Sequence, residues 1–187
     1  MYYFETIKCE DFEVLNLDYH NKRVANTIGL NINLQEYIYP PSNELLRCKV
    51  IYDEEGITDV EYFKYKKREI KSFKIIVEDK INYSKKYVNR TALDNLFNQR
   101  ENADEIIIIK NDFVTDTSIA NIAIHDGSSW ITPKTPLLYG TTRARLIEEK
   151  RIFEKEITID MLKNAKKFAL MNAMIDFDIL EDYSFFL

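Results

Sequence analysis

Three short stretches in the second half of the chain carry side chains whose types and order could serve one reaction. They are Lys85-Lys86-Tyr87-Val88-Asn89-Arg90, then Val114-Thr115-Asp116-Thr117-Ser118-Ile119-Ala120-Asn121, then Tyr139-Gly140-Thr141-Thr142-Arg143. A lysine amine condenses with an aldehyde only when it is unprotonated, so it needs burial or neighbouring positive charge to lower its pKa. Lys86, just before a predicted helix, suits that chemistry, and Lys85 beside it leaves the choice of lysine open from the residues themselves.

The other two stretches offer a carboxylate, Asp116, and an anion site. Gly140, Thr141 and Thr142 precede a helix predicted to begin near Arg143, where backbone N–H groups and the helix dipole favour a phosphate. Each feature by itself has an ordinary alternative: a solvated lysine, an aspartate in a strand-joining turn, or a capped helix without a ligand. Their common order along the chain makes the combination specific.

In this order the stretches resemble the class IV aminotransferases and aminodeoxychorismate lyases. They are similar to that family's cofactor-lysine segment, its pyridine-nitrogen carboxylate segment with a closing asparagine, and its phosphate-binding turn. Upstream, Phe4-Glu5-Thr6-Ile7 resembles an early strand and His20-Asn21-Lys22-Arg23 a helix ending in a phosphate-contacting arginine; downstream, Met171-Asn172-Ala173 resembles a late strand. The resemblance covers nearly the whole chain, strongly from Lys86 onward and weakly between Gly29 and Ile81.

The resemblance implies pyridoxal 5′-phosphate as cofactor, held by Lys86 as a Schiff base. Asp116, where the family usually has Glu, would pair with the pyridine nitrogen and keep the ring protonated. The residues expected to bind the cofactor are Arg23, Lys86, Asp116, Thr117, Ser118, Asn121, Thr141 and Thr142. Lys86 is also the expected catalytic base.

The reaction we expect first is the lyase that removes pyruvate from 4-amino-4-deoxychorismate to give 4-aminobenzoate for folate synthesis, because Asn89-Arg90 after the lysine resembles the lyases. An alternative is an aminotransferase for branched-chain or D-amino acids; Phe4, where D-amino acid aminotransferases have a tyrosine, slightly disfavours the D-amino acid version. A third alternative is a non-catalytic cofactor-binding protein, because the strand and loop that precede Phe4 in typical members are missing.

The elements that must position these residues differ between the two halves. Strand patterns cover 2–8, 45–52, 57–65 and 72–78, and a helix is predicted from about Leu17 to Ile28, ended by Gly29. The second half opens with a helix near Ile81 whose apolar face includes Val88, Ala92, Leu93, Leu96 and Phe97. Strands follow at 106–109, 118–124, 129–132, 168–171 and 175–180, with helices after Gly140 and Thr158.

This mixture predicts an α+β fold rather than a doubly wound sheet. The resemblance implies two domains with the fold of D-amino acid aminotransferase (PLP fold type IV): a small, shortened N-terminal domain at 1–80, a larger cofactor-binding domain at 81–187, and the cofactor between them. It also implies a homodimer acting on a small-molecule substrate, an amino-carboxylate.

Composition limits the remaining function classes. The 187 residues are 45% hydrophobic with a net charge of −5 and a pI of 5.2, which disfavours nucleic-acid partners despite the basic run at 64–68. No apolar run approaches the roughly 20 residues that span a bilayer, and Met-Tyr-Tyr-Phe-Glu-Thr lacks signal-peptide character, so we expect a cytoplasmic protein without membrane partners. Cys9 and Cys48 are expected to be reduced thiols, and two isolated histidines predict no metal site.

Overall fold

The computed structural model describes residues 1–187, and the chain forms two compact units. Unit 1 comprises Met1–Lys67 and Lys85–Asn89, and unit 2 comprises Arg68–Ser84 and Arg90–Leu187. The predicted domains, 1–80 and 81–187, are continuous in sequence, whereas the compact units are not. The domain boundary concerns which segments fold independently, and it stays a prediction.

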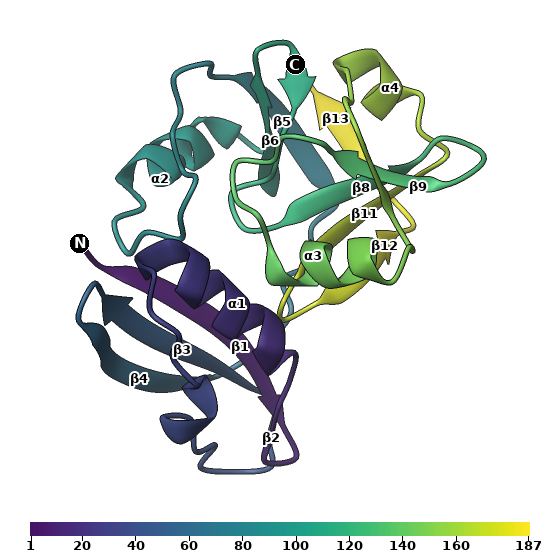
Figure 1. Ribbon diagram of the computed structural model, residues 1–187. Coiled ribbons are helices and arrows are strands. Elements are labelled where there is room, and N and C mark those ends of the chain that lie inside the picture. Colours follow the sequence, from purple (N-terminus) through teal and green to yellow (C-terminus); the bar gives the residue numbers. More distant parts are fainter. The chain divides into compact units, whose positions relative to one another are not determined.

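Unit 1 is built on an antiparallel sheet of four strands in the order β2-β1-β3-β4 (Figure 1). The strands are β1 (Tyr3–Glu10), β2 (Glu13–Val14), β3 (Leu46–Asp53) and β4 (Gly56–Lys64), and a short 3-10 helix, η1, spans Leu34–Glu36. Buried and partly exposed residues alternate along β1, as expected for a strand with one face against a core. The predicted strands at 2–8, 45–52 and 57–65 therefore correspond to β1, β3 and β4, with ends that differ by one or two residues.

Helix α1 (Leu17–Ile28) has the bounds that the sequence predicts. Gly29 follows it in the left-handed region at φ 78°, and its N–H donates to the carbonyl of Ala25, so the last turn closes where a residue without Cβ is favoured. Val24 and His20 are buried on the face that α1 turns toward the sheet. The helix thereby places His20 and Arg23 one turn apart.

The segment 85–89 pairs with β1 instead of forming the helix predicted near Ile81. The N–H of Phe4 donates to the Lys86 carbonyl at 2.9 Å and the N–H of Val88 donates to the Tyr2 carbonyl at 3.0 Å. These bonds flank an isolated bridge between Tyr3 and Tyr87, and helix α2 begins only at Thr91 and ends at Phe97. The predicted helix began too early, since Val88, assigned to its apolar face, precedes α2 and is exposed.

Unit 2 contains two sheets. One has the order β13-β5-β6-β7, with β5 (Ser72–Val77), β6 (Glu105–Lys110), β7 (Phe113–Val114) and β13 (Ser184–Phe186). The other has the order β10-β9-β8-β11-β12, with β8 (Asn121–His125), β9 (Trp130–Pro133), β10 (Phe153–Lys155), β11 (Lys167–Asn172) and β12 (Asp176–Leu180). The helices of this unit are α2, α3 (Thr141–Glu148) and α4 (Ile159–Lys163), and a 3-10 helix, η2, spans Asn98–Arg100.

The second-half predictions mostly hold. The four isoleucines of β6 are buried on both faces between parallel β5 and antiparallel β7, and Thr158 caps α4 by accepting a hydrogen bond from Met161 N–H. The strand expected from Ser118 begins only at Asn121, because residues 117–120 form a turn. Strands β2, β7, β10 and β13 were not predicted, since two or three residues carry too little periodicity.

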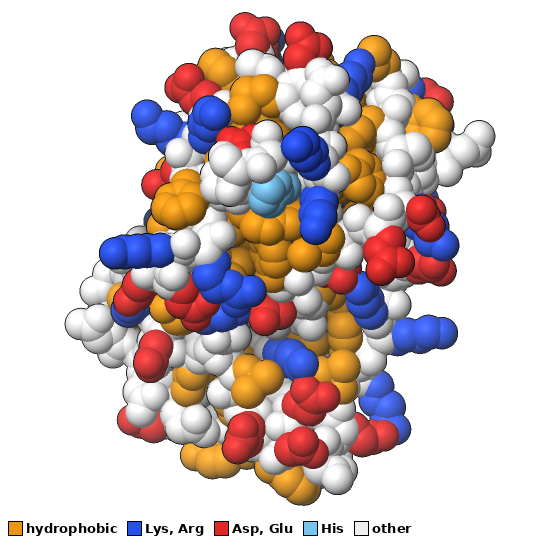
Figure 2. Space-filling view, turned by 90° about the vertical axis from the view of Figure 1, so that its right-hand side faces the viewer, with side chains coloured by type: hydrophobic (Ala, Val, Ile, Leu, Met, Phe, Trp, Pro, Cys, Tyr) orange, Lys and Arg blue, Asp and Glu red, His pale blue; other side chains and the backbone are white.

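The fold class is α+β, as predicted. Cys9 on β1 and Cys48 on β3 are buried free thiols. The longest helix of the chain, α1, has 12 residues, and no helix combines the length and the apolar character needed to cross a membrane. Charged side chains of both signs are scattered over the face drawn in Figure 2, and the Lys and Arg side chains form no continuous track on it.

Candidate functional site

The two adjacent lysines have different surroundings in unit 1. The Nζ of Lys85 donates to the carbonyl of Thr27 in the last turn of α1, at 2.7 Å, and lies 5.5 Å from the ring centroid of Tyr3. The Nζ of Lys86 lies over the ring of Phe4, 4.5 Å from its centroid. Lys85 therefore stabilises the end of a helix, whereas Lys86 contacts the ring of Phe4 on β1.

Arg23 is held by a buried carboxylate that the sequence did not single out. Its Nε donates to Glu5 Oε1 at 2.8 Å and its Nη2 donates to Glu5 Oε2. Glu5 is fully buried and also accepts from His20 Nδ1 at 2.5 Å and from the Tyr52 hydroxyl at 3.4 Å. Burial acts to raise the pKa of Glu5, but Arg23 and His20 outweigh it and lower the pKa to about 2.

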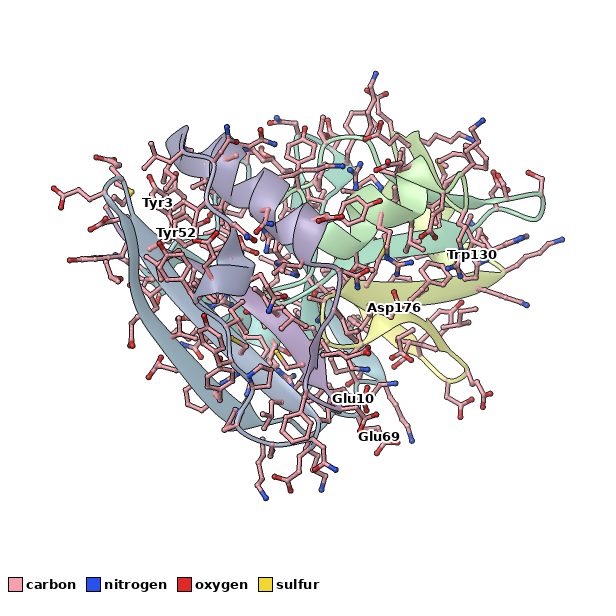
Figure 3. All side chains as sticks on the ribbon, turned by 60° about the horizontal axis from the view of Figure 1, so that its bottom comes forward. Tyr3, Glu10, Tyr52, Glu69, Trp130 and Asp176 are labelled. Atoms are coloured by element: carbon pink, nitrogen blue, oxygen red, sulfur yellow. The ribbon has the colours of Figure 1, made fainter.

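The core of unit 1 surrounds this cluster with aromatic rings. Tyr52 and Tyr3, labelled in Figure 3, pack with ring centroids 5.7 Å apart, and Tyr3 also contacts Tyr87 at 5.5 Å. Burial lowers the pKa of His20 and outweighs Glu5, which acts to raise it. His20 is therefore a neutral ring beside an ionised carboxylate.

Asp116 is a second buried carboxylate, in unit 2. Its Oδ1 accepts from Asn121 Nδ2 at 2.7 Å and its Oδ2 accepts from the Leu138 N–H at 2.9 Å. Burial raises the pKa of Asp116 to about 6, against the lowering effects of these donors and of Arg143. No cation is hydrogen-bonded to this carboxylate within the protein.

The turn after Asp116 is organised by Thr117. Its hydroxyl donates to the Ala120 carbonyl at 3.0 Å and accepts from the N–H groups of Ile119 and Ala120. The Ser118 N–H donates to buried Glu105 at 3.3 Å, and the Ser118 carbonyl accepts from Arg90 at 2.9 Å. Thr117 thus shapes the turn with its side chain, while Ser118 is held through its backbone.

The start of α3 lies against Asn121. A Cβ added to Gly140 would lie 1.9 Å from Asn121 Oδ1, so only glycine permits this approach. Thr141 and Thr142 are buried, and no side chain caps the helix, which leaves its first-turn N–H groups without a side-chain acceptor. Arg143 is also buried, donating to the Pro133 carbonyl at 2.8 Å and to Glu154 at 2.6 Å.

The predicted residues fall into two groups, one in each unit. In unit 2, Asn121 donates to Asp116 and to the Leu138 carbonyl, which precedes Thr141 and Thr142 in the chain. Thr117 and Ser118 lie in the turn between Asp116 and Asn121. In unit 1, Arg23 and Lys86 each contact the β1 strand, at Glu5 and Phe4 respectively.

Sequence reasoning missed the roles of Glu5, His20 and Glu105. A signal for Glu5 existed, because a carboxylate occupies an inward position of an alternating strand, between Tyr3 and Ile7. Glu105 precedes four consecutive isoleucines, and burial raises its pKa as well. For His20 the signal was its position one turn before Arg23.

Comparisons with known proteins agree on one family. The sequence profile described as amino-transferase class IV matches residues 78–177. An uncharacterized protein of Haemophilus influenzae strain Rd is 37% identical over 182 residues, which is 91% of this chain and 96% of that protein. The crystal structure of a proposed 4-amino-4-deoxychorismate lyase from Haemophilus somnus 129PT is 34% identical, with a TM-score of 0.85 over 92% of this chain and 96% of that one.

A more distant structure shares the fold. It is the pyridoxal-phosphate-bound form of a hypothetical aminotransferase from Mycobacterium tuberculosis, with 15% identity and a TM-score of 0.79 over 98% of this chain and 81% of that one. Lys86, Asp116 and the start of α3 all lie within the region that the profile matches.

Proposed function

Because the chain belongs to the class IV amino-transferase family and is an enzyme of that family, we propose that it is a pyridoxal-phosphate-dependent lyase that releases pyruvate from 4-amino-4-deoxychorismate to form 4-aminobenzoate. The observation that carries the cofactor assignment is Asp116, a buried carboxylate with neutral hydrogen-bond donors and no cation bonded to it. The choice of a lyase is supported by the 34% identity with the Haemophilus somnus protein.

The residues of the chain fit pyridoxal phosphate chemically. A buried carboxylate whose pKa is raised by burial gains most from a cationic partner, and a protonated pyridine nitrogen is such a partner. The start of α3 offers uncapped N–H groups and two threonine hydroxyls, which are suitable donors for a phosphate. These two features fit the two polar ends of the cofactor.

Each assigned residue has a distinct task. Bound pyridoxal phosphate supplies an electron sink for the carbanion formed from the substrate. Lys86 Nζ would hold the cofactor covalently and would take the proton from the substrate carbon as general base. Asp116 would hold the proton on the ring nitrogen, and Asn121 orients Asp116.

The phosphate is assigned to Arg23, Thr141 and Thr142. Thr117 shapes the turn that carries Ser118, and the family resemblance assigns Ser118 to cofactor binding. The surroundings of Lys85 support the choice of Lys86, because Lys85 Nζ is bonded to the end of α1. Pyruvate release needs no amino acceptor, which separates this reaction from transamination.

The first test is a visible absorption spectrum of the protein with added pyridoxal phosphate, before and after borohydride. We expect a lysine–cofactor band that borohydride locks in place, lost in Lys86→Ala and retained in the matched variant Lys85→Ala. The absence of such a band in the wild type would overturn the cofactor assignment. Loss of the band only in Lys85→Ala would move the assignment to the neighbouring lysine.

The second test separates the two reactions. Purified protein is mixed with 4-amino-4-deoxychorismate and no amino acceptor, and 4-aminobenzoate and pyruvate are measured. Equal amounts of both products are expected for the lyase, as a step of folate synthesis. Turnover that requires a 2-oxo acid would instead identify the aminotransferase alternative.

Assembly and location are further parts of the proposal. We expect a homodimer from the family resemblance, which light scattering of the purified protein tests. We expect a cytoplasmic location, which fractionation of the source cells tests.

A further inference from the structure

The buried cluster of Glu5, His20, Arg23 and Tyr52 in unit 1 has no task in the proposed reaction apart from Arg23. Glu5 and His20 are fully buried, and Arg23 is nearly so, with 14% of its side chain exposed. An ionised carboxylate in such a place is expensive to desolvate, and apolar residues of similar volume often give equal or better stability. Its presence therefore calls for a role other than core stability.

The bonds of Glu5 determine the orientation of the Arg23 guanidinium. Arg23 meets the two carboxylate oxygens with Nε and Nη2, the paired geometry in which one planar group fixes another. Because Nε belongs to the fork, the guanidinium cannot turn about its last bond without losing one of the two hydrogen bonds. The carboxylate thus sets the plane in which the rest of the guanidinium lies.

His20 fixes the carboxylate in turn. An ionised carboxylate only accepts hydrogen bonds, so the His20 nitrogen that contacts Glu5, Nδ1, must carry the hydrogen. Nε2 is then an acceptor, and it is buried without a hydrogen-bond partner. The ring therefore has a single bonded orientation, which holds the Glu5 oxygen that also meets Arg23 Nη2.

We infer that Glu5 is a positioning residue for the cofactor phosphate: it holds Arg23, with His20 behind it, in one orientation for binding an anion. The inference rests on the proposed function, which assigns Arg23 to the phosphate. A flexible arginine loses side-chain entropy when it binds, whereas a guanidinium already held by Glu5 does not, so the affinity for the phosphate is higher.

The test compares two aldehydes that differ in the phosphate. Pyridoxal phosphate carries it, and 5-deoxypyridoxal keeps the ring nitrogen and the aldehyde without it. Wild type, Glu5→Gln and Tyr52→Phe are titrated with each, following the lysine-adduct band and confirming the adduct by borohydride reduction and intact mass. Tyr52→Phe is the matched control, since it removes the long 3.4 Å bond to the same carboxylate and leaves both bonds between Glu5 and Arg23 in place.

We expect Glu5→Gln to weaken pyridoxal phosphate about tenfold or more while 5-deoxypyridoxal is bound as by the wild type, because a tenfold change corresponds to one charge-assisted hydrogen bond. Tyr52→Phe should leave the ratio of the two affinities unchanged. Equal weakening of both aldehydes, or of neither, would overturn the inference, because a general structural defect does not distinguish them.

Two further results keep the test decisive. If Glu5→Gln does not fold, Glu5→Asp replaces it: the charge stays, but the shorter side chain cannot reach both guanidinium nitrogens, so the affinity ratio should still fall, and an unchanged ratio would overturn the inference. If the wild type forms no adduct with either aldehyde, the proposed function itself fails, which is recognised in the wild type before any variant is compared.

Discussion

The two buried carboxylates of the protein have opposite electrostatics. Glu5 in unit 1 has a guanidinium and an imidazole as partners, and its pKa falls to about 2 although burial alone would raise it. Asp116 in unit 2 has an asparagine amide and a backbone N–H as bonded partners, and burial raises its pKa to about 6. Equal burial thus leads to opposite results, because only one carboxylate has a bonded cation.

The two carboxylates differ in their partners: Glu5 forms an ion pair within the protein, and Asp116 has only neutral hydrogen-bond donors. Glu5 finds its counter-charge within the protein, so we assign it to holding Arg23. Asp116 has no bonded counter-charge within the protein, and under the proposed function a bound pyridine nitrogen would supply one; a carboxylate whose pKa is raised by burial is a candidate for such a site. Three substitutions and one pH series test this distinction, in order from the largest expected effect to the smallest.

The largest effect on stability is expected from Glu5→Gln. Removing the carboxylate leaves the nearly buried Arg23 guanidinium without its counter-charge, which should lower the free energy of unfolding by about 3 kcal/mol or more. Urea unfolding of the protein without added cofactor measures this. A loss below about 1 kcal/mol, the value of an ordinary hydrogen bond, would show that Glu5 is not the counter-charge of Arg23.

Asp116→Asn should show the reverse pattern. The asparagine cannot hold a proton on a ring nitrogen, so we expect lyase turnover to fall about 10²- to 10³-fold, as when one preorganised electrostatic partner is removed. Stability at pH 7 should change little, because the variant loses one hydrogen-bond acceptor but no longer buries a charge. Steady-state kinetics and urea unfolding measure the two quantities, and a stable variant with wild-type turnover would break the comparison.

The pH dependence of stability should also differ between the two carboxylates. The pKa of Asp116 is raised from 3.8 to about 6 by folding, so its contribution is fully present below pH 4 and is lost as the pH rises through 6, a change of up to about 3 kcal/mol. The pKa of Glu5 is lowered from 4.5 to about 2, so its contribution is present above pH 4.5 and is lost only toward pH 2.

The measurement is urea unfolding of wild type and Asp116→Asn between pH 4 and 7, without cofactor. The wild type should lose stability relative to the variant as the pH rises through this range. Parallel curves for the two proteins would mean that Asp116 is ionised throughout and already has a counter-charge.

The smallest effect is expected from Gly140→Ala. The added Cβ would lie 1.9 Å from Asn121 Oδ1, so Asn121 must move and its bond to Asp116 weakens, at a cost of about 1 to 2 kcal/mol. Cofactor affinity should fall about tenfold, the equivalent of 1.4 kcal/mol. A double-mutant cycle with Asn121→Ala is the control: the cost of Gly140→Ala should largely vanish when the clashing amide is absent.

Much of the fold was predictable because local patterns determine it. The strand-forming residues of β1, the period of α1 with Gly29 after it, and the isoleucine run of β6 each reflect one local rule, and each predicted element was confirmed. The start of α2 was wrong because residues 85–89 bond to β1, a partner more than 80 positions away in the sequence. The turn at 117–120 was missed because a threonine hydroxyl replaces backbone partners there.

The sequence by itself determined the order of the lysine, the carboxylate and the glycine-threonine turn, and with it the family. It did not determine the partners of each charge: that Arg23 is held by Glu5, that Lys85 is bonded to the end of α1, and that Asp116 lacks a bonded cation were decided by tertiary structure. The physical reason is that a pKa depends on burial and on charges within a few ångströms, and folding brings together groups from distant positions to supply them.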